Sequence, residues 1–180
     1  SLDTDYIFEI ERVTGGAKVR VYDQNELLLT ENTLAGLPDA MELMVCLEAS
    51  DHARQVRFGD VVVLENDGYG DACDNCPDVY NPDQVDFDHF FDEPFDGTTI
   101  DDGAWGYSLP GVWSQDDRLS FETTTNVRPY FCTETQFVSI GQTARTRARL
   151  ISHHDDGSGT SYSVSLSLHE TLNWPRFGDS

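Results

Sequence analysis

The chain has 180 residues, of which 38% are hydrophobic, and its formal net charge at pH 7 is −22. This length and apolar content suffice for one buried core, and no apolar run approaches the roughly 18 residues that a membrane-spanning helix needs. The acidic balance excludes nucleic acid and anionic lipid surfaces as expected partners, because both would be repelled.

Residues 1–65 are dominated by period-two alternation, which predicts strands with one buried and one wet face. Apolar residues alternate with polar ones at 6–10 and again at 18–21, and turn residues follow at 14–16 and 23–25. The segment 41–49 could form a short helix. We expect a strand there, because its apolar residues also alternate, at Met41, Leu43, Val45 and Leu47.

An acidic stretch follows at residues 63–88. Its carboxylates recur every two to four residues, a Gly follows the first Asp, and two Cys bracket an Asp-Asn pair. No Lys or Arg occurs between Arg57 and Arg118, whereas sixteen acidic residues do. Hard divalent cations bind oxygen ligands, and Ca²⁺ accepts six to eight of them in irregular geometry. The stretch therefore predicts a calcium-organised loop.

The segment from Asp67 to Pro77 reads Asp-Gly-Tyr-Gly-Asp-Ala-Cys-Asp-Asn-Cys-Pro, and Asn81, Pro82, Gln84, Asp86 and Asp88 continue the pattern. This stretch of about 26 residues resembles the thrombospondin type 3 repeat, a calcium-wrapping motif of extracellular proteins. Two positions depart from that pattern: Val63 stands at its first ligand position, and Phe90-Phe91 replace the Asp-Gly of a following loop. The resemblance implies one complete calcium cluster and a second that has decayed or is shared.

The predicted ligands are side-chain carboxylates and one backbone carbonyl. Gly68 permits the sharp turn between them, and Pro77 and Pro82 stiffen the returning chain. An ordinary solvated acidic linker is the alternative, but such a linker does not need ordered Gly, Cys and Pro positions. The predicted metal-site residues are Glu65, Asp67, Tyr69 (through its carbonyl), Asp71, Asp74, Asp83, Asp86 and Asp88.

Alternation returns after the acidic stretch. In 144–150, Ala, Thr, Ala and Leu alternate with three Arg, and in 163–169, Val and two Leu alternate with Ser and His. A Gly-rich turn at 155–159 separates these two segments. About ten to twelve strands with almost no helix predict an all-β, antiparallel β-sandwich.

The order of the strands resembles a concanavalin-like (laminin-G-like) jelly roll in which two parts flank the calcium loop. Residues 1–65, ending in "RQVRFGDVVVLE", resemble the closing half, and residues 89–180, opening with "FDEPFDGTTIDDGAWGY", resemble the opening half. Residues 66–88 would form the thrombospondin type 3-like loop between them. The halves could close on each other as one permuted sandwich, which avoids exposed strand edges, or could await partner halves in a tandem array. A single ordinary sandwich with an inserted loop is a third possibility.

Two further clusters could bind ligands. Trp105, Tyr107 and Trp113 could form a sugar-stacking platform, although packing in the core or at its rim is the favoured role for such residues. His153-His154-Asp155-Asp156 could bind a metal, although its place in a Gly-rich turn favours a solvated loop.

The four cysteines admit three pairings. Cys73 and Cys76 could pair with each other and tighten the calcium loop. Cys46 and Cys132 lie in predicted strands, as either a buried pair or two separate thiols. Zinc is disfavoured, because no second Cys-x-x-Cys completes a tetrahedron. Cysteines of this number suit an oxidising compartment, and we expect an internal piece of a secreted or cell-surface protein.

The sequence contains neither the paired-carboxylate motif of laminarinase-type glycosidases nor a Gly-x-Ser-x-Gly nucleophile motif. We expect a calcium-binding, non-enzymatic structural or adhesive module of a multi-repeat protein, with Ca²⁺ as its cofactor and a glycan or a surface protein as a further partner. The alternative is a carbohydrate-binding module, or the remnant of a glycan-degrading enzyme on the same sandwich. Exposed aromatics on a concave sheet face would favour that alternative.

Overall fold

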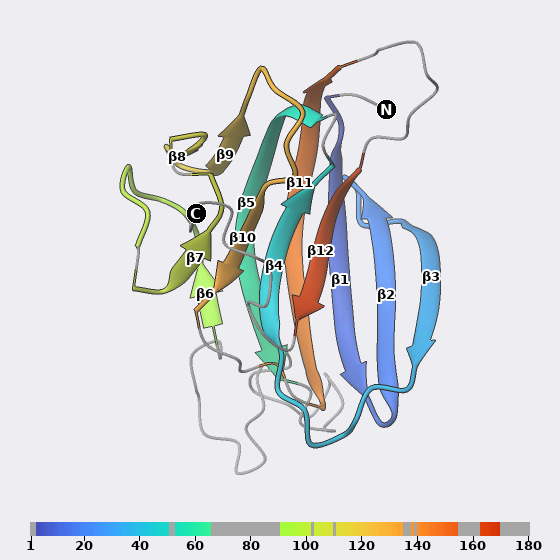
Figure 1. Cartoon of the computed structure of the whole chain (residues 1–180). Helices are drawn as coiled ribbons and strands as arrows, with labels where there is room; N and C mark the ends of the chain where they lie inside the picture. The colour runs from blue at the N-terminus through green and yellow to red at the C-terminus, as the bar shows by residue number, and fades with distance from the viewer. Residues whose placement is uncertain are drawn as a thin grey trace.

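The computed structural model describes residues 3–50, 53–65, 91–101, 103–109, 111–134, 138, 140–154 and 163–169. These residues form twelve strands and no helix. Accordingly, this part of the chain contains no helix that could cross a membrane. The strands build two antiparallel sheets that face each other (Figure 1). The expected all-β sandwich is confirmed.

The larger sheet has eight strands in the order β3-β2-β1-β11-β5-β9-β8, and β6 also pairs with β5. β6 pairs with residues 61–63 of β5, whereas β9 pairs with residues 55–58. The strands are β1 (Asp5–Val13), β2 (Gly16–Asp23), β3 (Leu28–Ala35), β5 (Ala53–Glu65), β6 (Phe91–Glu93), β8 (Trp113–Gln115), β9 (Leu119–Glu122) and β11 (Gln142–His153).

The smaller sheet has four strands in the order β12-β4-β10-β7. They are β4 (Met44–Ala49), β7 (Trp105–Tyr107), β10 (Tyr130–Thr133) and β12 (Val164–His169). Figure 1 shows this sheet in front of the middle of the larger one, with β2 and β3 extending beyond it. Every residue of the edge strand β3 is exposed, in agreement with that overhang.

Alternation along the strands decides which side chains enter the core. On β11, Ala144, Thr146 and Ala148 are buried between the sheets, whereas the intervening Arg145, Arg147 and Arg149 lie on the outer face. β4 likewise directs Val45, Leu47 and Ala49 into the core, so residues 44–49 form the expected strand rather than a helix. The period-two pattern therefore identified both the strands and their buried faces.

Strands from both sides of the acidic stretch alternate within each sheet. β11 lies between β1 and β5, and β4 lies between β12 and β10. β12 also contacts β1 and β11 across the sandwich. The described strands on both sides of the acidic stretch therefore share one core. The jelly-roll topology, and the assignment of residues 1–65, 66–88 and 89–180 to a closing half, a calcium loop and an opening half, remain predictions.

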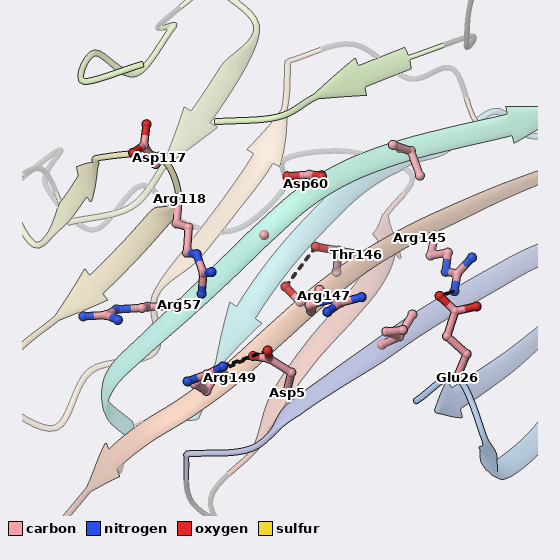
Figure 2. A pocket seen from close by; sticks show the side chains of 13 residues that line it. Asp5, Glu26, Arg57, Asp60, Asp117, Arg118, Arg145, Thr146, Arg147 and Arg149 are labelled. Carbon is pink, nitrogen blue, oxygen red and sulfur yellow. Dashed lines mark hydrogen bonds and ion pairs between the residues drawn. The ribbon is translucent and has the colours of Figure 1, made fainter. Parts of the chain in front are cut away.

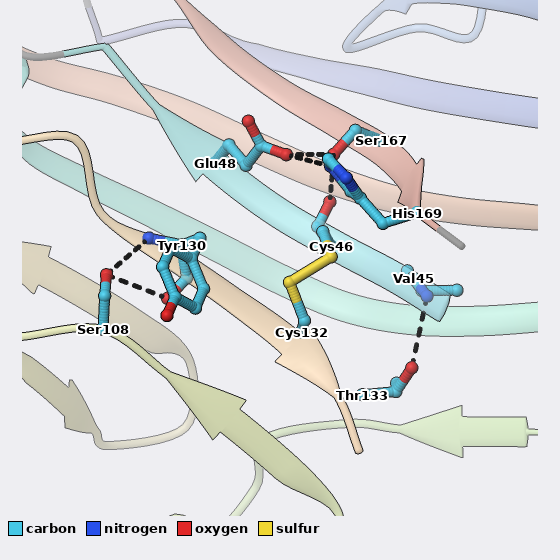
Figure 3. The surroundings of a disulfide bond; sticks show 9 residues. All are labelled: Val45, Cys46, Glu48, Ser108, Tyr130, Cys132, Thr133, Ser167 and His169. Atoms are coloured by element: carbon cyan, nitrogen blue, oxygen red, sulfur yellow. Dashed lines mark hydrogen bonds and ion pairs between the residues drawn. A yellow bond between two sulfur atoms is a disulfide. The ribbon is translucent and has the colours of Figure 1, made fainter. Parts of the chain in front are cut away.

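A disulfide joins Cys46 on β4 to Cys132 on β10 (Figure 3). These residues are direct cross-strand partners in the smaller sheet, their Cα atoms lie 4.1 Å apart, and both are buried. The sequence left open a buried pair or two separate thiols, and the structure has the buried pair. Cys73 and Cys76 lie outside the described residues, so their pairing remains a prediction.

Candidate functional site: an arginine-lined groove on the larger sheet

The predicted calcium ligands lie almost entirely outside the described residues. β5 ends at Glu65, whose side chain is not described, and Asp67, Tyr69, Asp71, Asp74, Asp83, Asp86 and Asp88 all fall between β5 and β6. The flanking strands are direct neighbours, because Val63 on β5 pairs with Phe91 on β6. The chain that enters the acidic stretch and the chain that leaves it are therefore held side by side in the larger sheet.

Within the described ranges, no group of three or more His, Cys, Asp and Glu side chains is arranged to hold a metal ion. Of the four residues His153-His154-Asp155-Asp156, the two His are described, and the two Asp lie beyond the described part of the chain. This possible metal site therefore stays untested as well.

The two tryptophans of the possible sugar platform, Trp105 and Trp113, lie in the core. Trp105 is 1% exposed and Trp113 is 7% exposed. Both pack against Phe131, with ring centroids 4.8 and 5.2 Å away, respectively. Tyr107 is half-buried and stacks on the same Phe131 ring. Packing, the favoured role, is therefore what the structure shows for Trp105 and Trp113, and neither has a free ring face for a sugar.

Glu48, Ser167 and His169 form a polar cluster beside the disulfide (Figure 3). His169 Nε2 lies 2.7 Å from Glu48 Oε1 and 3.0 Å from Ser167 Oγ, and the Ser167 hydroxyl also donates to Glu48. Both of these contacts use the same ring nitrogen of His169, Nε2. Burial tends to raise the pKa of Glu48, but the bonds from His169 and Ser167 outweigh it and lower that pKa. The cluster links β12 to β4 through side-chain hydrogen bonds.

The outer face of the larger sheet carries a groove of about 450 Å³. Its floor includes Ile7 on β1, together with Gly59 and Val62 on β5. Figure 2 shows charged side chains from several strands and turns around it, on the same side of the sheet. They are five cations, Arg57, Arg118, Arg145, Arg147 and Arg149, and four anions, Asp5, Glu26, Asp60 and Asp117.

Strand register places the arginines next to one another. Arg149 on β11 is the direct partner of Arg57 on β5, and Arg147 follows on the same face of β11. Arg118 immediately precedes Leu119, the β9 residue that pairs with Phe58. Residues that share one face at direct or diagonal positions lie within reach of long side chains. The groove therefore gathers positive charge across three adjacent strands.

Two of the five arginines have carboxylate partners. Arg149 donates from Nε and Nη2 to the two oxygens of Asp5, at 2.7 and 2.8 Å, and Arg145 Nη2 lies 3.3 Å from Glu26 Oε1. The hydrogen bonds from Arg149 lower the pKa of Asp5, and attraction from Arg147 and Arg118 adds to this effect. Within the described part of the chain, Arg57, Arg118 and Arg147 have no carboxylate within ion-pair distance.

A register shift between β5 and β11 shapes the floor of the groove. Thr146 pairs with Val61 and Ala148 with Phe58, so Gly59 and Asp60 together face Arg147. Such a bulge redirects side chains, and both Asp60 and Arg147 are exposed. A Cβ on Gly59 would lie 3.4 Å from the Cβ of Arg147, an ordinary contact, and would occupy part of the floor of the groove.

Sequence reasoning did not find this groove. The alternation of Arg145, Arg147 and Arg149 indicated only a wet strand face, and Arg57 and Arg118 were noted merely as the borders of a stretch without basic residues. One signal was available: in a chain with 11 basic and 33 acidic residues, three arginines at alternate positions are an unusual concentration of positive charge.

No family model matches the chain, and no curated protein matches it significantly.

Proposed function

We propose that this chain is a calcium-stabilised, non-enzymatic structural or adhesive module of a secreted or cell-surface protein. The observation that carries the proposal is the direct pairing of Val63 with Phe91, which anchors both ends of the acidic stretch in one sheet. Because the sheet already joins these ends, an ion bound between them would stabilise the β5–β6 pairing and the core beneath it. The carboxylate-rich donor set of the stretch fits Ca²⁺.

Two further observations bear on this proposal, one on export and one on the carbohydrate-binding alternative. The Cys46–Cys132 disulfide suits an oxidising compartment. Trp105 and Trp113 are buried, which makes the carbohydrate-binding alternative the less favoured of the two. An adhesive or structural role is therefore the better-supported proposal.

Calcium removal tests this proposal. A ligand that binds only the folded state at a hundredfold excess over its Kd stabilises that state by about 2.7 kcal/mol. We therefore expect a clear fall in Tm when excess EDTA replaces saturating calcium in a thermal melt. An unchanged melting curve would contradict the proposal.

A matched pair of variants separates a binding site from general acidity. Asp71→Ala removes a predicted ligand, whereas Asp78→Ala removes the same charge at a position outside the motif. Titration calorimetry should show a much larger loss of calcium affinity for Asp71→Ala. Equal losses would mean that the stretch attracts calcium only through its overall charge.

A further inference from the structure

We propose that the arginine-lined groove binds an acidic polypeptide segment in extended conformation, with its carboxylates held by Arg57, Arg118 and Arg147. The groove is formed by described residues on β1, β5 and β11 and on the turns before β3 and β9. The proposal therefore goes beyond the calcium-stabilised module, and it does not depend on calcium.

The distribution of charge is the first argument. The groove holds five of the 11 basic residues of the chain, but only four of its 33 acidic residues. On so acidic a chain, a local concentration of arginine is the place where an anionic ligand meets attraction rather than repulsion.

The second argument is that three arginines of the groove lack a carboxylate partner. Acidic residues outnumber basic ones threefold, and yet Arg57, Arg118 and Arg147 have no carboxylate within ion-pair distance among the described residues. Arg149, directly opposite Arg57, is already neutralised by Asp5. The cations of the groove left without a carboxylate are therefore Arg57, Arg118 and Arg147, and guanidinium groups bind carboxylates in bidentate geometry.

The spacing of the arginines favours a polypeptide. Arg57 on β5 and Arg147 on β11 stand at diagonal positions of the same face, roughly 7 Å apart. Carboxylates at alternate positions of an extended peptide have that same spacing, about 6.8 Å, because the peptide has the geometry of a strand.

The acidic side chains of the groove disfavour a uniformly charged polyanion. Asp60 and Asp117 line the groove, and no described residue forms an ion pair with either. A uronate or sulfate polysaccharide would bring charge against them at every step. A peptide can place neutral or basic residues beside these carboxylates and reserve its acidic residues for the arginines.

Fluorescence anisotropy tests the proposal with a short fluorescein-labelled peptide of alternating Glu and Ser, and with its Gln-Ser counterpart. We expect the Glu-Ser peptide alone to bind, and its affinity to fall as NaCl is raised. Arg147→Gln should raise its Kd about tenfold, because one charge-assisted contact is lost. Arg128→Gln is the matched control, since Arg128 is exposed and lies outside the groove.

A melting curve of Arg57→Gln separates binding from stability. This variant should also weaken peptide binding about tenfold, while its Tm should stay close to that of the parent, because Arg57 forms no ion pair with a described residue. The proposal is overturned if Arg147→Gln and Arg57→Gln bind the peptide like Arg128→Gln, or if the parent chain does not bind it. Polygalacturonate that binds more tightly than the peptide, with the same loss in Arg147→Gln, would identify a polysaccharide site instead.

Discussion

The arginines on the outer face of the larger sheet differ in their ion pairing between the two ends of the sheet. On β1, β2 and β3, Arg20 donates to three carboxylates: Glu9 at 2.8 Å, Glu11 at 2.7 Å and Glu31 at 2.7 Å. On β5, on β11 and directly before β9, three arginines lie close together without a carboxylate partner among the described residues. Since carboxylates are abundant in this chain, unpaired arginines in one cluster indicate a binding surface, whereas Arg20 holds strands together.

Two glycines, one at each end of this face, should differ most in their contribution to stability. A Cβ on Gly16, at the paired end, would lie 2.0 Å from the carbonyl oxygen of Leu34 on β3, so the backbone of one strand would have to move. Gly16→Ala should therefore destabilise the protein by about 3 kcal/mol, as severe overpacking does. Gly59→Ala should cost less than about 1 kcal/mol, because its Cβ would make only ordinary contacts. Denaturant unfolding measures both, and equal losses would contradict the expected difference.

Removing Arg20 should have the next largest effect. The hydrogen bonds of Arg20 to three carboxylates raise its pKa despite its partial burial, so it stays charged at any ordinary pH. Arg20→Gln would leave Glu9, Glu11 and Glu31 clustered without a cation, and we expect a loss of about 2 kcal/mol. Arg57→Gln removes the same charge from the other end of the face and should not destabilise the fold. A shared loss of stability in both variants would erase the distinction between the two ends.

Acid titration should give the smallest effect. The hydrogen bonds from Arg149 lower the pKa of Asp5 in the folded state below its unfolded value of about 4. This ion pair therefore stabilises the fold fully above about pH 4, and its contribution is lost as the pH falls below that value. The Tm of Asp5→Asn should accordingly fall less between pH 6 and pH 3 than the Tm of the parent does. Asp117→Asn serves as the charge-matched control in the same groove, and identical pH profiles for all three proteins would rule out this role for Asp5.

The sequence predicted the sandwich because alternation is a local property. Ala144, Thr146 and Ala148 are apolar or small at every second position, and that pattern alone identifies a strand with one buried face. The favoured packing role of Trp105 and Trp113 followed similarly from their type and place. Apart from the backbone of Glu65, the predicted calcium ligands lie outside the described residues and remain predictions.

The groove and the disulfide could not be predicted, because both depend on register between distant strands. Arg57 meets Arg149, and Cys46 meets Cys132, only once β5 pairs with β11 and β4 with β10. A shift of one residue would turn each of these side chains to the opposite face. No local pattern in the sequence fixes which of the possible pairings forms.

The interleaving of the strands also dictates when the chain can fold during synthesis. β1 and β5 are joined in the larger sheet only through β11, which follows far later in the chain and pairs with both. At ribosomal rates of about 5–20 residues per second, the early strands would wait on the order of 10 s for that partner. Until then, unpaired strand edges of the nascent chain would be open to chaperones and to other chains. The larger sheet is therefore completed late, by a strand that follows the acidic stretch.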